Sequence, residues 1–305
     1  MIPLGNDGAR PPLDTWPTGD LLEVLWASQA GAIAAVQSAL PALQRAVDGA
    51  VERLAGGGRL VYAGAGSSGM IAALDALELG ATFDWPEDRT LIWIAGGFDL
   101  RRGPDAAAED DAAGGRAAVG AAGLGASDVV LGISASGASP YTVAVVDEAR
   151  ARGAMTVAVA SCADSPLVRA ADHAVVTATG DEVIAGSTRL AAGTAQKLVL
   201  NLFSTAVMVR LGRVFDNLMI EVRPANAKLR QRRIAIVAAI AGVEPQIAAD
   251  ALERHGDVKR AVLGLAGMHA AEIEAALIHA GGHLRAALGP DDGRRGARRD
   301  DRSPR

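Results

Sequence analysis

Residues 60–69 read Leu-Val-Tyr-Ala-Gly-Ala-Gly-Ser-Ser-Gly, a short apolar run that passes directly into a loop of glycine and serine. A helical pattern follows that loop. The same order returns over 129–140, where an apolar run leads into Ser-Ala-Ser-Gly-Ala-Ser-Pro and a second helical pattern. A buried strand, a tight loop and a helix in this order are typical of the α/β class, in which helices cover a parallel sheet.

Three more apolar runs continue the alternation of short strands and longer helical patterns. The five runs are 60–63, 91–95, 129–133, 156–160 and 174–177. Because the runs are short and the stretches between them are helical, the sequence predicts a mainly parallel five-stranded sheet with helices on both faces.

Helical patterns also flank this α/β region. Apolar residues recur at helical spacing over 20–54, and Pro41 predicts a break, so we expect two helices there. Glycines punctuate a small all-α segment over 226–288. Residues 289–305 hold six arginines and four aspartates with almost no apolar content, and we expect them to be disordered. The expected parts are N-terminal helices packed on the α/β domain (1–56), the α/β domain (57–225), a small helical domain (226–288) and a tail (289–305).

The composition argues against several classes of protein. Half of the 305 residues are hydrophobic and 21% are charged, which is enough apolar material for a sizeable core. The net charge of −5 argues against a nucleic-acid binder. The single cysteine, Cys162, excludes an intrachain disulfide and a cysteine-built zinc site. No apolar run approaches the roughly 20 residues of a membrane span, and residues 1–17 lack a signal-peptide pattern, so we expect a cytoplasmic protein without a membrane partner.

The first loop, residues 64–69, matches the formal pattern G-x-G-x-x-G of dinucleotide-binding proteins. Two observations count against such a site. A dinucleotide site needs an acid at the end of the second strand, but Asp84, Glu87 and Asp88 all precede that strand. The design is also repeated after the third strand, with serines in both loops.

Serine hydroxyls and free backbone N–H groups at a helix N-terminus favour a bound anion. The candidate anion ligands are Ser67 and Ser68 in the first loop and Ser134, Ser136 and Ser139 in the second. A compact phosphate monoester suits two such loops better than an extended cofactor does. The alternative, that the serines only cap their helices, stays open.

Two glutamates are candidates for acid–base chemistry. Glu78 shares a helical stripe with Ile71 and Leu74, so we expect it to face the protein body, where an apolar flank favours the neutral carboxyl that a general acid needs. Glu109 stands in the run Glu-Asp-Asp over 109–111, a pattern that by itself favours a solvated face or a helix start. The positions of Glu78 and Glu109 in the sequence do not show whether the two side chains lie close together.

A second polar segment, residues 186–189, lies at the start of the long helix-forming stretch 187–211. Ser187 and Arg189 could bind an anion or sugar oxygens there, or form an ordinary surface pair. The histidines show no metal-ligand spacing, and no nucleophile elbow of the form G-x-S-x-G occurs. We therefore expect neither a metal nor a cofactor.

Several sequence blocks together resemble the N-acetylmuramic acid 6-phosphate etherase family over about residues 57–288. The blocks are Gly-Ala-Gly-Ser-Ser-Gly at 64–69, Leu-Asp-Ala-Leu-Glu at 74–78, Ile-Ala-Gly-Gly at 94–97, Ala-Glu-Asp-Asp at 108–111, Ser-Gly-Ala-Ser-Pro-Tyr at 136–141, Gly-Ser-Thr-Arg at 186–189 and Gly-Thr-Ala-Gln-Lys-Leu-Val-Leu-Asn at 193–201. The resemblance implies a sugar isomerase (SIS) domain, a three-layer α/β/α sandwich, followed by a small helical domain.

The resemblance also implies an activity. The family cleaves the D-lactyl ether of its sugar phosphate by elimination and addition of water, without metal or redox cofactor, in recycling of cell-wall amino sugars. By position, Glu78 matches the acid that protonates the departing ether oxygen, and Glu109 matches the base that removes the C2 proton. The five loop serines would bind the phosphate with Ser187 and Arg189 nearby, and the family works as a homodimer.

Three positions depart from the family pattern. The family has arginine where Met70 and Ala138 stand and lysine where Ala192 stands. These missing charges leave open which sugar phosphate the site takes. Two other functions also stay open: a non-catalytic sugar-phosphate-binding regulator, and an aldose–ketose sugar-phosphate isomerase. A regulator has no need of both glutamates, and an isomerase needs a ring-opening base, commonly histidine, which is not found near the two loops.

Overall fold

Five strands of the computed structural model form one sheet. They are β1 (Leu60–Gly64), β2 (Thr90–Ile94), β5 (Val129–Ile133), β6 (Met155–Ala160) and β7 (His173–Val176). They lie in the order β2-β1-β5-β6-β7, and every pairing is parallel. The expected α/β fold with a parallel five-stranded sheet is confirmed. The structure describes residues 12–99, 101 and 103–289.

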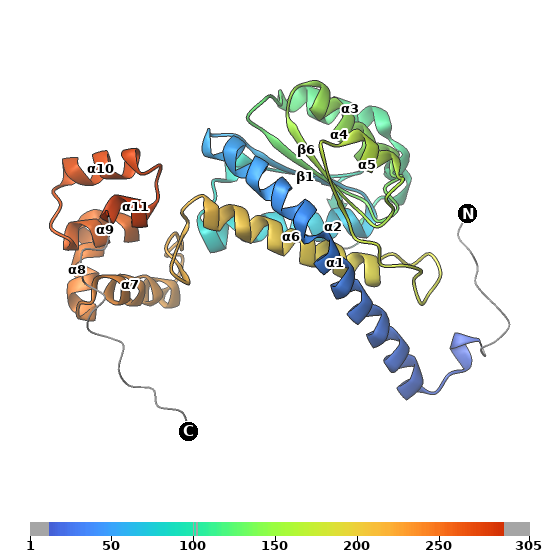
Figure 1. Ribbon diagram of the computed structural model, residues 1–305, viewed down its shortest axis with the longest axis horizontal. Helices are drawn as coiled ribbons and strands as arrows, with labels where there is room; N and C mark the ends of the chain where they lie inside the picture. The colour runs from blue at the N-terminus through green and yellow to red at the C-terminus, as the bar shows by residue number, and fades with distance from the viewer. Residues whose placement is uncertain (1–11, 100, 102, 290–305) are drawn as a thin grey trace. The chain divides into compact units, whose positions relative to one another are not determined.

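Helices cover both faces of this sheet (Figure 1). One face carries α1 (Thr18–Ala55), α2 (Gly66–Phe83) and α6 (Ala191–Arg210), and the other carries α3 (Ala112–Ala122), α4 (Pro140–Ala151) and α5 (Pro166–Ala170). Successive side chains of β1 point to opposite faces. Val61 therefore packs with Val145 of α4, whereas the hydroxyl of Tyr62 reaches Asp75 of α2.

The N-terminal helix α1 runs unbroken through Pro41, so the expected break at this proline is wrong. Proline has no N–H for the helical hydrogen bond and normally kinks or ends a helix. Here Val36 and Ala39 before the proline and Leu43 and Ala46 after it are all buried. Burial of apolar side chains on both sides of Pro41 offsets the missing hydrogen bond.

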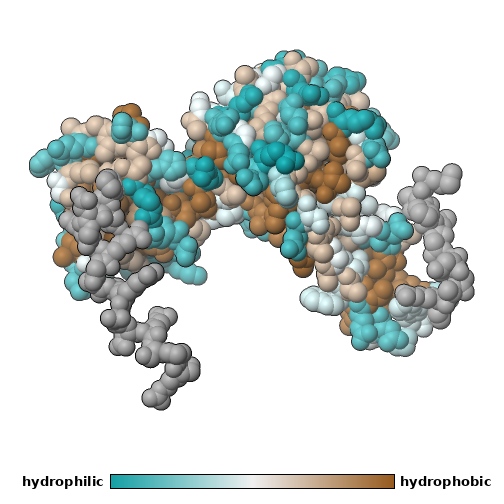
Figure 2. All heavy atoms as spheres, viewed as in Figure 1, coloured by the Kyte–Doolittle hydropathy of each residue, from teal (hydrophilic) through white to brown (hydrophobic). Residues whose placement is uncertain are grey.

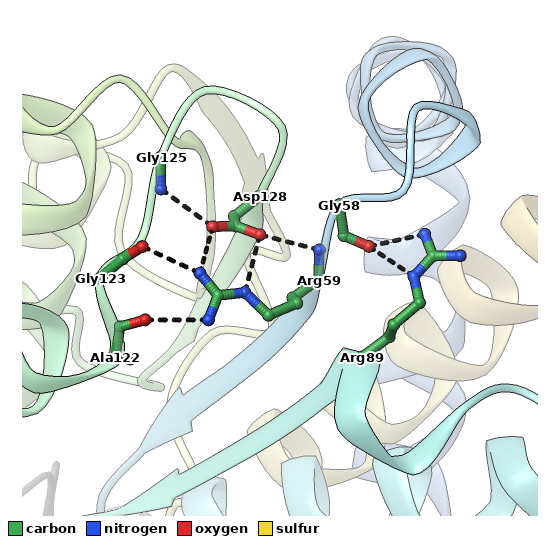
Figure 3. Close-up of polar contacts among 7 residues, drawn as sticks. All are labelled: Gly58, Arg59, Arg89, Ala122, Gly123, Gly125 and Asp128. Carbon is green, nitrogen blue, oxygen red and sulfur yellow. Dashed lines mark hydrogen bonds and ion pairs between the residues drawn. The ribbon is translucent and has the colours of Figure 1, made fainter.

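Two arginines organise the edge where the parallel strands begin (Figure 3). Arg59 binds Asp128 in front of β5 and also donates to the carbonyl of Ala122 at 2.9 Å. Arg89, in front of β2, donates from Nε to the carbonyl of Gly58 at 2.9 Å. These contacts tie the amino ends of β2, β1 and β5 together. The two serine loops, after β1 and β5, lie at the opposite edge, where the strands end.

The chain divides into two compact units. The first holds residues up to Gly80 and Trp85–Val207, and the second holds Ala81–Asp84 and residues from Met208 onward. The second unit contains the hairpin β8 (Val214–Phe215) and β9 (Leu218–Met219), followed by α7 (Ala227–Ala241), α8 (Pro245–His255), α9 (Val258–Leu265), α10 (Ala270–His279) and α11 (Leu284–Leu288). Its own core includes Ile236, Val237, Leu263 and Ile273.

This helical segment agrees with the small all-α part expected over 226–288. The expected tail lies outside the described residues apart from Gly289. In the described part of the chain no single helix is long and apolar enough to cross a membrane, although the bent pairs α7–α8 and α9–α10 reach that threshold jointly, by length and composition.

Candidate functional site

The two serine loops start side by side at the carboxyl edge of the sheet. β1 and β5 are neighbours, and their last residues, Gly64 and Ile133, are partners in the register. Ser67 and Ser68 lie half-buried in the first turn of α2, where backbone N–H groups have no intrahelical acceptor. One anion placed at this edge would therefore have access to both loops.

The second loop is built from its own serine hydroxyls. The buried Ser134 accepts a hydrogen bond from the N–H of Gly137 at 3.1 Å, and the exposed Ser136 accepts one from the N–H of Ala138 at 3.2 Å. Ser139 is the N-cap of α4, because its Oγ accepts from the N–H of Thr142 at 3.4 Å. The capping alternative is thus seen at Ser139. Of these three serines, Ser136 is the one that presents its side chain to solvent.

Glu109 reaches the same edge of the sheet from β2. Its element, the 3₁₀ helix η3 (Ala106–Asp110), follows the hairpin β3 (Phe98–Asp99) and β4 (Gly103–Pro104). A Cβ added to Gly96, just after β2, would lie 2.8 Å from the Cβ of Ala108, so η3 packs directly on the turn that ends β2. Glu109 is half-buried there, and its neighbour Asp111 caps α3 by accepting from the N–H of Gly114.

Glu78 does not face the body of its own chain, and the expectation drawn from its stripe is wrong for a single subunit. Its side chain is 60% exposed, and Leu74 and Leu77 beside it are 49% and 69% exposed. The helix instead turns Ala72, Asp75 and other small or polar residues inward. Helical periodicity correctly placed Glu78 and Leu74 on one stripe of the helix, but it could not show whether that stripe packs against the protein or is exposed.

A buried polar cluster lies directly behind Glu78. Lys197 of α6 places its Nζ 3.4 Å from Oε2 of Glu78 and 4.0 Å from Oδ1 of Asp75. Asp75 accepts hydrogen bonds from the hydroxyl of Tyr62 at 2.9 Å and from Oγ of Ser204 at 3.3 Å. Burial raises the pKa of Asp75, and the bonds from Tyr62 and Ser204 and the charge of Lys197 only partly oppose that rise.

Sequence reasoning assigned no role to Lys197 or Asp75, although both stand in the blocks that carry the family resemblance. One signal was available for each. Asp75 is a charged residue three positions before Glu78 in a helix of apolar residues, and Lys197 is one of only three lysines among thirty basic residues. What no local pattern could show is that residues 119 positions apart in the chain make contact.

The segment with Ser187 and Arg189 leads into α6. Glu182 holds the start of this helix, because its two carboxylate oxygens accept from the N–H groups of Ala191 at 2.9 Å and Ala192 at 3.0 Å. A Cβ added to Gly193 would lie 3.4 Å from Cδ1 of Ile71. The first turn of α6 therefore packs beside the early turns of α2. Ser187 is half-buried and Arg189 is exposed.

The helix geometry separates Glu78 from the anion loops within one chain. Ser67 and Glu78 lie on the same helix, α2, and a rise of about 1.5 Å per residue puts roughly 16 Å between them along the axis. That distance exceeds the length of one hexose phosphate. The structure thus brings Glu109 and the two loops to one edge, while Glu78 stands apart on the exposed side of α2.

No metal-binding arrangement is found in the described ranges 12–99, 101 and 103–289, where no three His, Cys, Asp or Glu side chains converge as ligands would. The polar groups that could contact a ligand at the carboxyl edge of the sheet are hydroxyls, backbone N–H groups and carboxylates.

Comparison with known proteins gives two matches to SIS domain models, over residues 27–161 and 117–206. Among curated proteins, the N-acetylmuramic acid 6-phosphate etherase of Deinococcus radiodurans is 46% identical over 91% of this chain and 92% of its own length. The etherase of Rubrobacter xylanophilus is 45% identical over 93% of each chain. Among solved structures, a phosphoheptose isomerase from Francisella tularensis is 20% identical over 64% of this chain and 100% of that chain, with a TM-score of 0.47.

Proposed function

Since the chain belongs to the N-acetylmuramic acid 6-phosphate etherase family, we propose that it cleaves the D-lactyl ether of N-acetylmuramic acid 6-phosphate by elimination and addition of water. The products are N-acetylglucosamine 6-phosphate and D-lactate. The observation that carries this is the 46% identity over 91% of the chain. Family membership also supports a cytoplasmic role in recycling cell-wall amino sugars.

The phosphate binds at the carboxyl edge of the sheet. Backbone N–H groups at the start of α2 and the hydroxyls of Ser67 and Ser68 supply one side of that site, and the loop of Ser134, Ser136 and Ser139 supplies the other. Ser187 and Arg189 add donors to the sugar from the turn before α6. Hydrogen bonds to a fixed phosphate orient the ring, which converts part of the binding energy into alignment of the reacting carbons.

Each of the two glutamates transfers one of the two protons in this reaction. Glu109 takes the proton from C2 while the bond between C3 and the ether oxygen breaks, and Glu78 gives a proton to the departing lactate oxygen. Water then adds at C3 and returns a proton to Glu78, and Glu109 returns its proton to C2. Both glutamates end the cycle in their starting states, so no further reactant is needed.

Glu78 serves the site of a second copy of the chain in this proposal, because it stands too far along α2 from the loops of its own chain. The exposed stripe of Leu74 and Leu77 gives the face on which such a copy packs. Exposed apolar side chains continue along α1 at Leu22, Trp26 and Ile33, and Figure 2 shows hydrophobic surface over the part of α1 that extends beyond the sheet. A homodimer covers these residues and completes the site.

Incubation of the protein with N-acetylmuramic acid 6-phosphate, followed by an enzymatic assay of D-lactate, tests the proposal. We expect D-lactate and N-acetylglucosamine 6-phosphate in equal amounts. Saturable binding of the sugar phosphate without D-lactate would instead identify a non-catalytic regulator, and conversion to a ketose phosphate would identify an isomerase.

A further inference from the structure

One lysine contacts two carboxylates of very different burial. Nζ of Lys197 lies 3.4 Å from Glu78, whose side chain is 60% exposed, and 4.0 Å from Asp75, whose side chain is 4% exposed. The lysine side chain itself is 31% exposed. Lys197 therefore links the interior of the first unit to the glutamate that the proposed function places in catalysis.

The inner end of this link is anchored on the central sheet. The hydroxyl of the fully buried Tyr62 on β1 and Oγ of Ser204 on α6 both donate to Asp75. A buried carboxylate without such partners would be strongly destabilising, so the three groups hold one another in place. The ammonium of Lys197 thus stands 4.0 Å from a carboxyl group that is fixed in the interior, as well as 3.4 Å from Glu78.

We propose that Lys197, held by Asp75, is a positioning residue for Glu78 in the elimination and hydration of the sugar phosphate; this inference rests on the proposed function. When Glu78 gives its proton to the ether oxygen, negative charge develops on its carboxylate beside the ammonium. When water adds at C3, the same carboxylate receives a proton. A preorganised cation stabilises that charge in both transition states and fixes the orientation of the carboxylate.

An ordinary surface ion pair would behave differently. Exposed pairs contribute about 0–1 kcal/mol because water screens them and both side chains lose freedom. In this protein the ammonium also faces the buried carboxyl group of Asp75 at 4.0 Å, so its freedom is already restricted when it meets Glu78. A lysine also suits two carboxylates one helical turn apart, since its ammonium is a compact point charge, whereas arginine presents a planar fork.

The test compares Lys197→Met with wild type in the D-lactate assay. The methionine keeps the length of the side chain and removes the charge. We expect kcat to fall about 100-fold, in the range found when a donor to a developing charge is removed, while KM for the sugar phosphate stays the same. Lys228→Met, at an exposed lysine of the second unit, is the matched control and should keep wild-type kcat.

Two further variants separate positioning from a structural effect. Glu78→Gln combined with Lys197→Met should be no slower than Glu78→Gln alone, because the lysine acts only through the glutamate. Ethylammonium added to Lys197→Ala should restore part of kcat. Melting temperatures of all variants, measured alongside, show whether any loss comes from unfolding.

The outcomes distinguish this inference from the proposed function. Wild-type protein that releases no D-lactate refutes the proposed function itself. An active wild type with a Lys197→Met variant of equal kcat refutes the role of Lys197. The role of Lys197 is also refuted if the effects of Lys197→Met and Glu78→Gln on kcat add up in the double variant and ethylammonium does not raise the kcat of Lys197→Ala. If Lys197→Met fails to fold, two other measurements decide the question. One is the ethylammonium experiment on Lys197→Ala. The other is the isosteric variant Asp75→Asn, in which kcat should fall at constant KM.

Discussion

Arg59 and Asp128 meet through two parallel hydrogen bonds, from Nε to Oδ1 at 3.1 Å and from Nη2 to Oδ2 at 2.8 Å. The Asp128 carboxylate also accepts from the backbone N–H of Arg59 and of Gly125. Burial by itself would raise the pKa of Asp128, but the hydrogen bonds from Arg59 and Gly125 and the charge of Arg59 lower it below its ordinary value of 3.8. The pair joins the amino ends of two central strands.

We therefore expect Asp128→Asn to lower the free energy of unfolding by about 2 kcal/mol at neutral pH. A carboxyl whose pKa is lower in the folded state stabilises the fold above its unfolded pKa and loses that effect as the pH falls through its folded pKa. The difference between wild type and variant should thus be full at pH 7 and shrink below about pH 4. Urea unfolding at several pH values measures it, with Asp147→Asn, at an exposed position of α4, as control. A difference that stays constant down to acid pH would contradict the argument.

Glu109→Gln and Glu78→Gln should each reduce kcat for D-lactate release by about 10²–10⁴-fold, because an amide can neither give nor take the transferred proton. Binding of the sugar phosphate, measured by calorimetry, should survive in both. Asp110→Asn, next to Glu109 and exposed, is the control and should keep most activity. Full turnover in either glutamine variant would remove that glutamate from the mechanism.

Gly137→Ala should disturb the second anion loop. Gly137 has φ +64°, and a Cβ there would lie 2.1 Å from Oγ and 2.4 Å from Cβ of Ser165, the N-cap of α5. The loop or the cap must move, at a cost of about 1–3 kcal/mol. We expect a lower melting temperature and weaker binding of the sugar phosphate. Gly125→Ala, where added atoms meet open space, should leave both unchanged.

Leu77→Arg should separate the proposed homodimer. This side chain is 69% exposed beside Glu78, and a charged, longer side chain at the centre of an apolar contact would have to lose its hydration. Sedimentation should report a monomer that has lost D-lactate release but keeps its melting temperature within a few degrees. Ile278→Arg, at an 80% exposed residue of the second unit, is the control. A wild-type protein that is already monomeric and active would exclude the homodimer.

Mixed dimers test whether Glu78 serves the partner's loops. Glu78→Gln and Glu109→Gln chains should each be weakly active alone. When the two are unfolded and refolded together, half of the dimers are mixed and each mixed dimer has one intact site, so activity should return to about a quarter of wild type. No recovery in mixed dimers that demonstrably form would place Glu78 and Glu109 in one chain's site.

Local sequence patterns were sufficient to predict the α/β class, the parallel sheet, the two serine loops and the family. These features depend on local patterns, because five apolar residues followed by glycine, serine and a helix have few structural solutions. The segment over 20–54 shows the limit of this approach, since Pro41 predicts a break that burial on both sides of it prevents.

Which groups the functional side chains contact depends on the packing of the whole chain. Periodicity placed Glu78 on one stripe with Leu74 but could not tell whether that stripe packs on its own chain or stays exposed, and the structure shows it exposed. The strand order brings the loops after β1 and β5 together, and the packing of α6 on α2 brings Lys197 to Glu78. Such contacts join residues far apart in the chain, and they form only when burial of the whole core sets the distances between helices and sheet.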